Sequence, residues 1–331
     1  MKKTPIVSII VPIYRTEQYI HRCLDSIASQ TNQHFEAILM DDGSDDHCPS
    51  ICDEYVAKYP DIFKVVHQKN QGISIVRNNG IKLSSGKFIT FIDSDDYVSS
   101  TFIEDLIQGQ SFNNADLTIC SYKKESNQHL ESHIFHSAHL KNDQLYKLIT
   151  EHNILPQCYT WNKLYKKEII LKHNLRFEPK VSLAEDAIFL FQYLLHINNI
   201  ELINKENYYY QVSIRDNNLM SIKRDFKERL SNYQYYYTNI KKLEQYLNNK
   251  EVTKNIGKHL SIMIDRQIQS IYKKKESHIN RIAHLKQIDL KTYALHRKGW
   301  SLVDSALVWL LTHRFYHTYD FIMNYISHRN E

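Results

Sequence analysis

The sequence predicts an α/β domain followed by a helical extension. In the first two thirds of the chain, short apolar runs alternate with segments whose apolar residues recur at helical spacing. Two of these runs end in clustered carboxylates, and ligands of parallel sheets collect at the carboxyl ends of the strands. From residue 221 onward, long amphipathic patterns replace the strand-like runs. We therefore expect a ligand-binding domain over residues 1–220 and a helical unit over 221–331.

Composition bounds the class of protein. The chain has 331 residues, 42% hydrophobic and 24% charged, as in an ordinary folded protein. Its five cysteines show no paired spacing, which favours a reducing compartment. The N-terminal apolar run is too short for a signal peptide, and Ala306–Leu311 is far below the ~20 residues that span a bilayer. We expect a cytoplasmic protein with no membrane span and no nucleic-acid partner.

Charge is distributed unevenly along the chain. Residues 221–331 carry 20 Lys and Arg against 10 Asp and Glu, whereas residues 1–220 carry 22 against 27. The two parts should therefore meet different partners. A basic, aromatic-rich helical tail suits an anionic membrane surface or a large acceptor, and peripheral membrane contact would follow from the first. A helical add-on packed against the preceding domain, or a homodimer contact, explains the pattern equally well.

The first two expected strands each lead to a candidate binding residue. Ile6–Pro12 is a β-branched run, and we expect the strand to stop at Pro12 because proline lacks the N–H that a central ladder needs. Tyr14 then lies in a strand-to-helix loop. Phe35–Met40 ends in Asp41 and Asp42, where Asp41 could accept a hydrogen bond from a nucleobase imide or a ribose hydroxyl. An ordinary Asp/Gly turn is the alternative.

The third strand, Phe63–His67, is followed by Asn70, Gly72 and a helix that carries Arg77. Gly72 lets the backbone turn close to a ligand. The Arg77 guanidinium lies one turn into the helix, where it could bind a diphosphate bidentately. A solvated surface arginine is the alternative.

The most informative stretch is an apolar strand, Phe88–Ile92, that runs directly into Asp93, Ser94, Asp95 and Asp96. Carboxylates packed so closely repel one another unless a cation joins them. A hard divalent ion such as Mg²⁺ or Mn²⁺ is the natural counter-charge. The alternative is a helix cap, with Asp96 or Ser99 accepting backbone N–H groups.

Three later segments complete the pattern. Residues 123–150 are polar and His-rich, which we interpret as a surface excursion without metal. Trp161, Asn162 and Lys163 suit stacking on a sugar ring, and a packed Trp with a surface Lys is the alternative. Ser182 and Glu185 have the spacing of a capping box for a helix over 186–196. That places Asp186 in a first turn, where a general base would stay ionised. The alternative is that Glu185 and Asp186 are ordinary acidic residues at the start of a helix.

The tail shows three helical patterns. Phe226–Leu247 and Ile256–Ile271 each have one apolar face and together predict a helical hairpin. Ser301–Ile326 continues helically and contains Trp309, Phe315 and Phe321.

Taken together, these motifs resemble the family 2 glycosyltransferases of the GT-A fold. The resemblance covers roughly residues 5–220 and rests on segments that occur in the family's order: Val7–Tyr14, Asp41–Ser44, Asn70–Gly72 with Arg77–Gly80, Asp93–Asp95, Trp161–Lys163 and Glu185–Asp186. It implies a Rossmann-like, mixed but mostly parallel sheet flanked by helices, with a C-terminal all-helical extension.

The resemblance also implies residue roles. Pro12, Tyr14 and Asp41 would hold uridine, and Arg77 would lie near the nucleotide. Asp93 would contact ribose and metal, Asp95 would bind Mn²⁺ or Mg²⁺, and Asp186 would be the base of an inverting transfer. The remaining residues implied to contact the nucleotide-sugar are Asp42, Asn70, Gly72, Ser94, Trp161, Asn162, Lys163 and Glu185.

Departures from the family pattern narrow the expected activity. Val76 replaces the family's common alanine before the Arg-Asn pair, which is a small packing change. The Gln-x-x-Arg-Trp motif of processive synthases is missing, so we expect transfer of one sugar. The expected donor is UDP-galactose or UDP-glucose, with no residue that singles out either, and the acceptor a glycan, glycolipid or glycoprotein.

Two other classes of protein were weighed. A sugar-nucleotide pyrophosphorylase would need a glycine-rich loop after its first strand, which Tyr14–Glu17 lacks. An inactive carbohydrate-binding or scaffolding protein would keep the fold but lose Asp95 or Asp186, and both are present.

Overall fold

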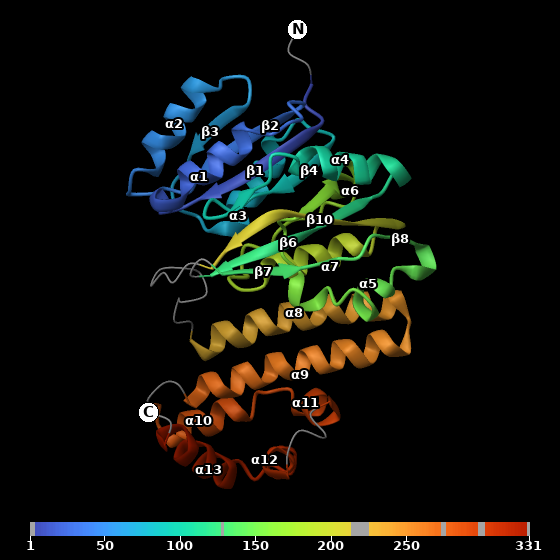
Figure 1. Ribbon diagram of the computed structural model, residues 1–331. Helices are drawn as coiled ribbons and strands as arrows, with labels where there is room; N and C mark the ends of the chain where they lie inside the picture. Colours follow the sequence, from blue (N-terminus) through green and yellow to red (C-terminus); the bar gives the residue numbers. More distant parts are fainter. Residues whose placement is uncertain (1–3, 127–128, 213–224, 273–275, 297–301, 330–331) are drawn as a thin grey trace. The chain divides into compact units, whose positions relative to one another are not determined.

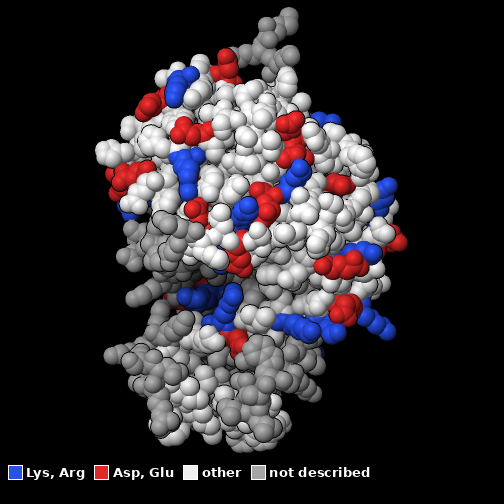
Figure 2. All heavy atoms as spheres, viewed as in Figure 1, with Lys and Arg blue, Asp and Glu red and all other residues white. Residues whose placement is uncertain are grey.

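The computed structural model describes residues 4–126, 129–212, 225–272, 276–296 and 302–329 (Figure 1). The chain divides into two compact units, Met1–Ile222 and Lys223–Glu331. On the face that Figure 2 shows, acidic and basic side chains are interspersed over the first unit.

The first unit is built on a mixed sheet, as expected. Its described part has ten strands in the order β3-β2-β1-β4-β9-β6-β10-β5, with β7 beside β6 and β8 beside β10. Strands β1 to β4 are parallel neighbours, β6 and β10 are parallel, and β9 runs antiparallel to β4 and β6. The strands are β1 Val7–Ile13, β2 Phe35–Asp41, β3 Phe63–His67, β4 Phe88–Phe91, β5 Tyr97–Val98, β6 Leu117–Ser126, β7 His129–His133, β8 Ala138–Lys141, β9 Lys163–Lys166 and β10 Asn199–Gln211.

Helices flank this sheet (Figure 1). They are α1 Glu17–Ala28, α2 Cys48–Lys58, α3 Ile73–Leu83, α4 Phe102–Asn113, α5 Lys147–Thr150, α6 Lys167–Lys172 and α7 Glu185–Leu194. In α1, the apolar residues Ile20, Leu24 and Ile27 recur at helical spacing and are all buried. Figure 1 shows how the strand-helix alternation of the first 90 residues places α1 to α3 around β1 to β4.

The expectation that the first strand stops at Pro12 is wrong, because β1 continues to Ile13 with Pro12 opposite Met40 of β2. The reason lies on the other side of β1. There β4 pairs only with Val7–Ile10, so the strand that would accept a hydrogen bond from position 12 has already ended.

Residues 123–150 also contain more regular structure than expected. Strand β6 runs to Ser126 and pairs with β7, and β8 pairs with β10. All five residues of β7 are at least partly exposed, so its polar sequence reflects exposure and not irregular structure.

The second unit is helical in all its described segments: α8 Phe226–Leu247, α9 Lys250–Tyr272, α10 His278–Leu285, α11 Leu290–His296, α12 Leu302–Thr312 and α13 Tyr316–Arg329. Asn248 is the C-cap of α8, and its φ of 41° allows the reversal into α9. The prediction of one continuous helix over 301–326 is wrong. Arg314, at φ 63°, separates α12 from α13, and Ser301 lies outside the described residues.

In the described ranges, no helix combines the length and the apolar character that crossing a bilayer requires.

Candidate functional site

Three neighbouring strands deliver the predicted acids to one edge of the sheet. β1, β2 and β4 are parallel, so their carboxyl ends meet there. Ile13 is in register with Asp41, and Ile10 with Phe91, two residues before Asp93. Pro12 is buried in β1, whereas Tyr14, just beyond the strand, is 43% exposed. The edge therefore combines an exposed aromatic ring with carboxylates.

Asp41 and Asp42 have different partners at the end of β2. Asp41 is 2% exposed; its Oδ1 accepts from the Ser44 backbone N–H at 3.1 Å, and its Oδ2 lies 2.9 Å from His67 Nδ1. The Asp/Gly turn is therefore present, but with a buried carboxylate.

Asp42 secures the loop before α3. Its carboxylate accepts from the backbone N–H groups of Gln71 and Gly72 at 2.9 and 2.8 Å. Gly72 adopts φ 87°, a conformation that favours glycine. Asn70 is exposed, and its backbone N lies 2.9 Å from where a Cβ on Gly43 would be, so this approach requires glycine at position 43.

Arg77 connects the acidic edge to α7. The guanidinium is 4% exposed, with Nη1 2.9 Å from Glu185 Oε1 and Nη2 3.3 Å from Asp93 Oδ1. Burial lowers the pKa of Arg77, but Asp93 and Glu185 more than compensate and raise it overall. Its Nε has no hydrogen-bond partner among the described residues. The surface-arginine alternative is therefore wrong.

Asp96 anchors the turn after β4 to strand β10. This carboxylate is fully buried and accepts from the Tyr208 hydroxyl at 2.6 Å and the Gln211 backbone N–H at 2.8 Å. Burial, and then the charges of Asp95 and Asp93, raise its pKa well above the ordinary value. The cap alternative for Asp96 is wrong, since α4 begins after Thr101 and has no side-chain cap.

The other residues of this turn are arranged differently. Ser94 is 3% exposed and its Oγ accepts from the Thr16 hydroxyl at 3.0 Å, which ties the turn to the loop after β1. Asp93 and Asp95 remain partly exposed. The two carboxylates thus lie at the surface of a turn that its neighbours fix in place.

The carboxylates of Asp93 and Asp95 are ligands of the kind that a divalent cation prefers. In the part of the chain that the structure describes, no cluster of three His, Cys, Asp or Glu side chains could hold a metal by itself. Magnesium-type sites commonly use only one or two protein carboxylates and complete their shell with phosphate oxygens and water. Asp93 and Asp95 fit such a shared site, because their mutual repulsion, felt also by Asp96, is what a cation would relieve.

Asp186 lies in the first turn of α7. The helix begins at Glu185, and Ala184 at φ 64° is its N-cap with no side-chain cap hydrogen bond. The predicted capping box is therefore wrong, and the Glu185 carboxylate instead binds Arg77. Burial, then the adjacent Glu185 charge, raise the pKa of Asp186 to about 7, and Asp93 contributes in the same direction. Because Arg77 contacts both Glu185 and Asp93, the start of α7 that carries Asp186 lies beside the acidic turn.

Trp161 and Lys163 are both more buried than expected. Trp161 is 2% exposed and stacks on Tyr159 and Tyr208, with ring centroids 4.4 and 4.3 Å apart, so the packed-Trp alternative describes it. The part of that alternative that places Lys163 at the surface is wrong. Lys163 is fully buried, its Nζ lies 2.8 Å from Asn162 Oδ1, and burial lowers its pKa to about 8.

Sequence reasoning missed the tyrosines around Trp161. Tyr208 and Tyr210 alternate on β10 and so share one face of the sheet, and both stack on Trp161. The available signal was the run Tyr208–Tyr210 at the end of a strand-like segment. Together with Tyr159 and Trp161, these two tyrosines are referred to below as the aromatic cluster.

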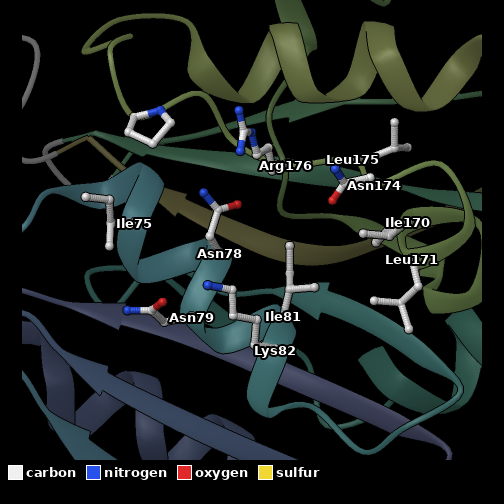
Figure 3. A pocket seen from close by; sticks show the side chains of 11 residues that line it. Ile75, Asn78, Asn79, Ile81, Lys82, Ile170, Leu171, Asn174, Leu175 and Arg176 are labelled. Carbon is white, nitrogen blue, oxygen red and sulfur yellow. The ribbon is translucent and has the colours of Figure 1, made fainter.

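A separate pocket of about 330 Å³ lies between α3 and the segment Ile170–Pro179 (Figure 3). Its lining includes Asn78, Lys82 and Arg176 but none of the candidate site residues. The Asn78 side chain makes two hydrogen bonds, of 2.8 and 2.9 Å, to the Phe177 backbone, while the Phe177 ring lies 5.3 Å from Arg77 Cζ. The pocket is thus distinct from the site, and Phe177 lies between the two.

Comparison with known proteins identifies the family of the chain. The family model described as "Glycosyl transferase family 2" matches residues 8–173. EpsH of Bacillus subtilis (strain 168), which is named as a glycosyltransferase, is 35% identical over 274 residues, covering 78% of this chain and 76% of EpsH. The poly(ribitol-phosphate) beta-glucosyltransferase of Bacillus spizizenii is 30% identical over 65% of this chain but only 33% of its own length.

A solved structure gives the same fold. TarS 1-349 of S. aureus in complex with UDP-GlcNAc superposes with a TM-score of 0.70 at 20% sequence identity, covering 98% of this chain and 92% of that one.

Proposed function

Because the chain belongs to glycosyltransferase family 2, we propose that it transfers one hexose from a UDP-sugar to a hydroxyl group of a glycan acceptor, with inversion and with the help of Mn²⁺ or Mg²⁺. One observation carries the proposal. Arg77 joins Glu185, the neighbour of a carboxyl group with a pKa of about 7, to Asp93 at the acidic turn. These contacts support a site that combines a base with an acidic, cation-binding turn.

The donor is assigned to the edge formed by β1, β2 and β4. Tyr14 offers an exposed ring for the base, and Asp41 offers a carboxylate for an imide N–H or a ribose hydroxyl. A UDP-sugar is the donor class we propose, as in the UDP-GlcNAc complex of the similarly folded TarS. Within that class we favour UDP-galactose or UDP-glucose.

The chemistry follows from the charges of the chain's own residues. Asp186, in its ionised form, takes the proton of the acceptor hydroxyl as that oxygen attacks the anomeric carbon. The Glu185–Arg77–Asp93 arrangement holds α7 against the acidic turn, so that the base and the leaving diphosphate take fixed places. Asp93 and Asp95 would hold the divalent cation, which supplies positive charge against the charge developing on the leaving group.

The two units receive different roles. We assign donor binding and catalysis to the first unit. We assign to the basic second unit a contact with an anionic membrane surface, a large acceptor or a second copy of the chain, at the cytoplasmic side of the cell membrane. Surface polysaccharide and glycoprotein glycans are the acceptor classes proposed.

The test is UDP release from a panel of UDP-sugars, measured with Mn²⁺, with Mg²⁺ and with excess chelator. Wild type is compared with Asp95→Ala, and with Asp143→Ala as a control, because Asp143 is an exposed acid in the short helical turn Asn142–Gln144 and is not a candidate site residue. We expect chelator and Asp95→Ala to abolish most release and to weaken UDP binding, while Asp143→Ala behaves as wild type. Activity that chelator leaves unchanged would refute the metal role.

The same panel separates the second candidate function. An inactive GT-A scaffold or carbohydrate-binding protein would release no UDP from any donor with any acceptor, yet would still bind glycans.

A further inference from the structure

We propose that Tyr159 and Tyr210 form the platform on which the acceptor sugar lies, and that this platform selects a neutral pyranose over an acyclic, anionic polyol phosphate. The inference rests on the proposed function, because it assigns the second substrate of the same site.

The outer members of the aromatic cluster are the ones that reach the surface. Trp161 is 2% exposed and Tyr208 is fully buried, so neither can receive a ligand on an open face. Tyr159 and Tyr210 are partly exposed. Their rings are 5.8 Å apart and tilted by 32° from each other, and both stack on Trp161. Buried Trp161 and Tyr208 therefore support the two partly exposed rings.

The platform lies beside the catalytic acids. The Asp186 carboxylate raises the pKa of Tyr159, after the larger effect of burial. Burial, then Tyr159, and then Asp96, Asp93 and Asp95 raise the pKa of Tyr210. Hydrogen bonds place the aromatic cluster beside the acidic turn: the Tyr208 hydroxyl donates to Asp96 Oδ2 at 2.6 Å and accepts from the Asp93 backbone N–H at 3.1 Å. The Gln211 backbone N–H, next to Tyr210, donates to Asp96 Oδ1 at 2.8 Å. On these contacts we place the acceptor sugar on the two rings, with one hydroxyl directed at Asp186.

Both phenol groups are also available for hydrogen bonds. Tyr159 and Tyr210 are partly exposed, and neither hydroxyl is among the buried polar atoms that lack a hydrogen-bond partner in the described residues. A pyranose presents a flat face of C–H groups to an aromatic ring and hydroxyls around its rim, which matches a pair of rings that carry hydroxyls. An acyclic polyol has no such face.

Charge points to the same choice. The ionised Asp186 carboxylate acts on Tyr159, so an acceptor that carries its own phosphate would be repelled by the base. A neutral sugar avoids this repulsion.

The variants Tyr159→Leu and Tyr210→Leu remove the rings, and Tyr159→Phe removes only one hydroxyl. The matched control is Tyr209→Leu, because Tyr209 precedes Tyr210 on β10, points to the opposite face and stacks on Tyr97 at 4.5 Å. Acceptor probes are methyl β-D-glucopyranoside, methyl β-D-galactopyranoside and ribitol 5-phosphate. UDP release to water, without acceptor, is measured for each variant.

We expect both leucine variants to raise the KM for the pyranosides about tenfold, whereas Tyr209→Leu keeps both this KM and UDP release to water within about twofold of wild type. Tyr159→Phe should keep most of the affinity, and Tyr209→Leu should match wild type. The proposal is overturned if the leucine variants transfer as well as wild type, if they lose hydrolysis and transfer in parallel, or if ribitol 5-phosphate is a better acceptor than the pyranosides.

Saturation-transfer NMR of a methyl pyranoside with UDP-bound protein measures the platform without turnover. Signal lost in Tyr159→Leu and kept in Tyr209→Leu supports the platform, and unchanged signal overturns it. A wild type that releases no UDP from any donor refutes the proposed function, and the NMR result still decides whether a sugar binds here.

Discussion

Both units contain a buried charge cluster, around Arg77 in the first unit and around Asp320 in the second, and the two clusters are built differently. In the first unit, Arg77 is shared between Glu185 and Asp93, and its Nε has no partner among the described residues. In the second unit, Asp320 is 1% exposed and accepts two hydrogen bonds from Arg281, at 2.7 and 2.9 Å. Its Oδ2 also lies 2.7 Å from His278 Nδ1.

The contrast separates a structural charge cluster from one suited to function. Burial works against ionised Asp320, but hydrogen bonds from Arg281 and His278 still hold its pKa below the ordinary value. Near Arg77, by contrast, one cation serves several acids, and the pKa of Asp186 is raised. A cluster with too little positive charge is costly in the free protein, and a ligand or cation can supply what is missing.

The largest expected effect tests the base. Asp186→Asn keeps the shape of the side chain but cannot accept a proton, so we expect transfer to fall by about 10²–10⁴-fold. UDP-sugar binding, measured by calorimetry, should change little. Asp320→Asn is the matched control and should transfer at the wild-type rate. Full activity in Asp186→Asn would remove this residue from the mechanism.

The reverse pattern is expected for stability. Asp320→Asn leaves the Arg281 guanidinium without its counter-charge, and we expect a loss of about 1–3 kcal/mol in the free energy of unfolding. Because the folded-state pKa of Asp320 is lowered, its contribution is present above the unfolded value and lost as pH falls below it. Urea unfolding at pH 7 and pH 3.5 should therefore show a difference from wild type that narrows in acid. A constant difference would contradict the charge argument.

The pH dependence of transfer sharpens the comparison further. With a pKa of about 7, Asp186 is increasingly protonated below neutrality. We expect kcat/KM to fall about tenfold for each pH unit well below 7 and to level off above it. Steady-state rates between pH 5.5 and 8.5 test this, with unfolding monitored in the same buffers. A flat profile across pH 6–8 would mean that Asp186 ionises with an ordinary pKa.

The smallest effect is on the stability of the same base variant. A raised folded-state pKa means that the folded protein binds this proton more tightly than the unfolded chain, so ionised Asp186 costs stability as pH rises above about 3.8. Asp186→Asn removes that cost. We expect its Tm to exceed that of wild type at pH 8 and to match it at pH 4. An equal or lower Tm at pH 8 would show that another interaction of Asp186 outweighs the burial cost.

Residues whose role depends on local order were predicted well. The strands that lead to Asp41 and Asp93 follow from apolar runs, and parallel pairing then brings their ends to one edge. Residues whose role depends on distant partners were not. The end of β1 depends on how far β4 extends, and the cap of α7 depends on Glu185 binding Arg77, 108 residues away in sequence.

The sequence by itself determined the family, the order of strands and helices, and the delivery of acids to the carboxyl ends of strands, because periodicity and turn chemistry act over a few residues. Tertiary structure decided which charges became buried together, since Lys163 and Arg77 look like surface residues in any local window. It also decided that Trp161 packs beneath Tyr159 and Tyr210. Burial and electrostatic coupling are properties of neighbours in space, and these neighbours come from five separate segments of the chain.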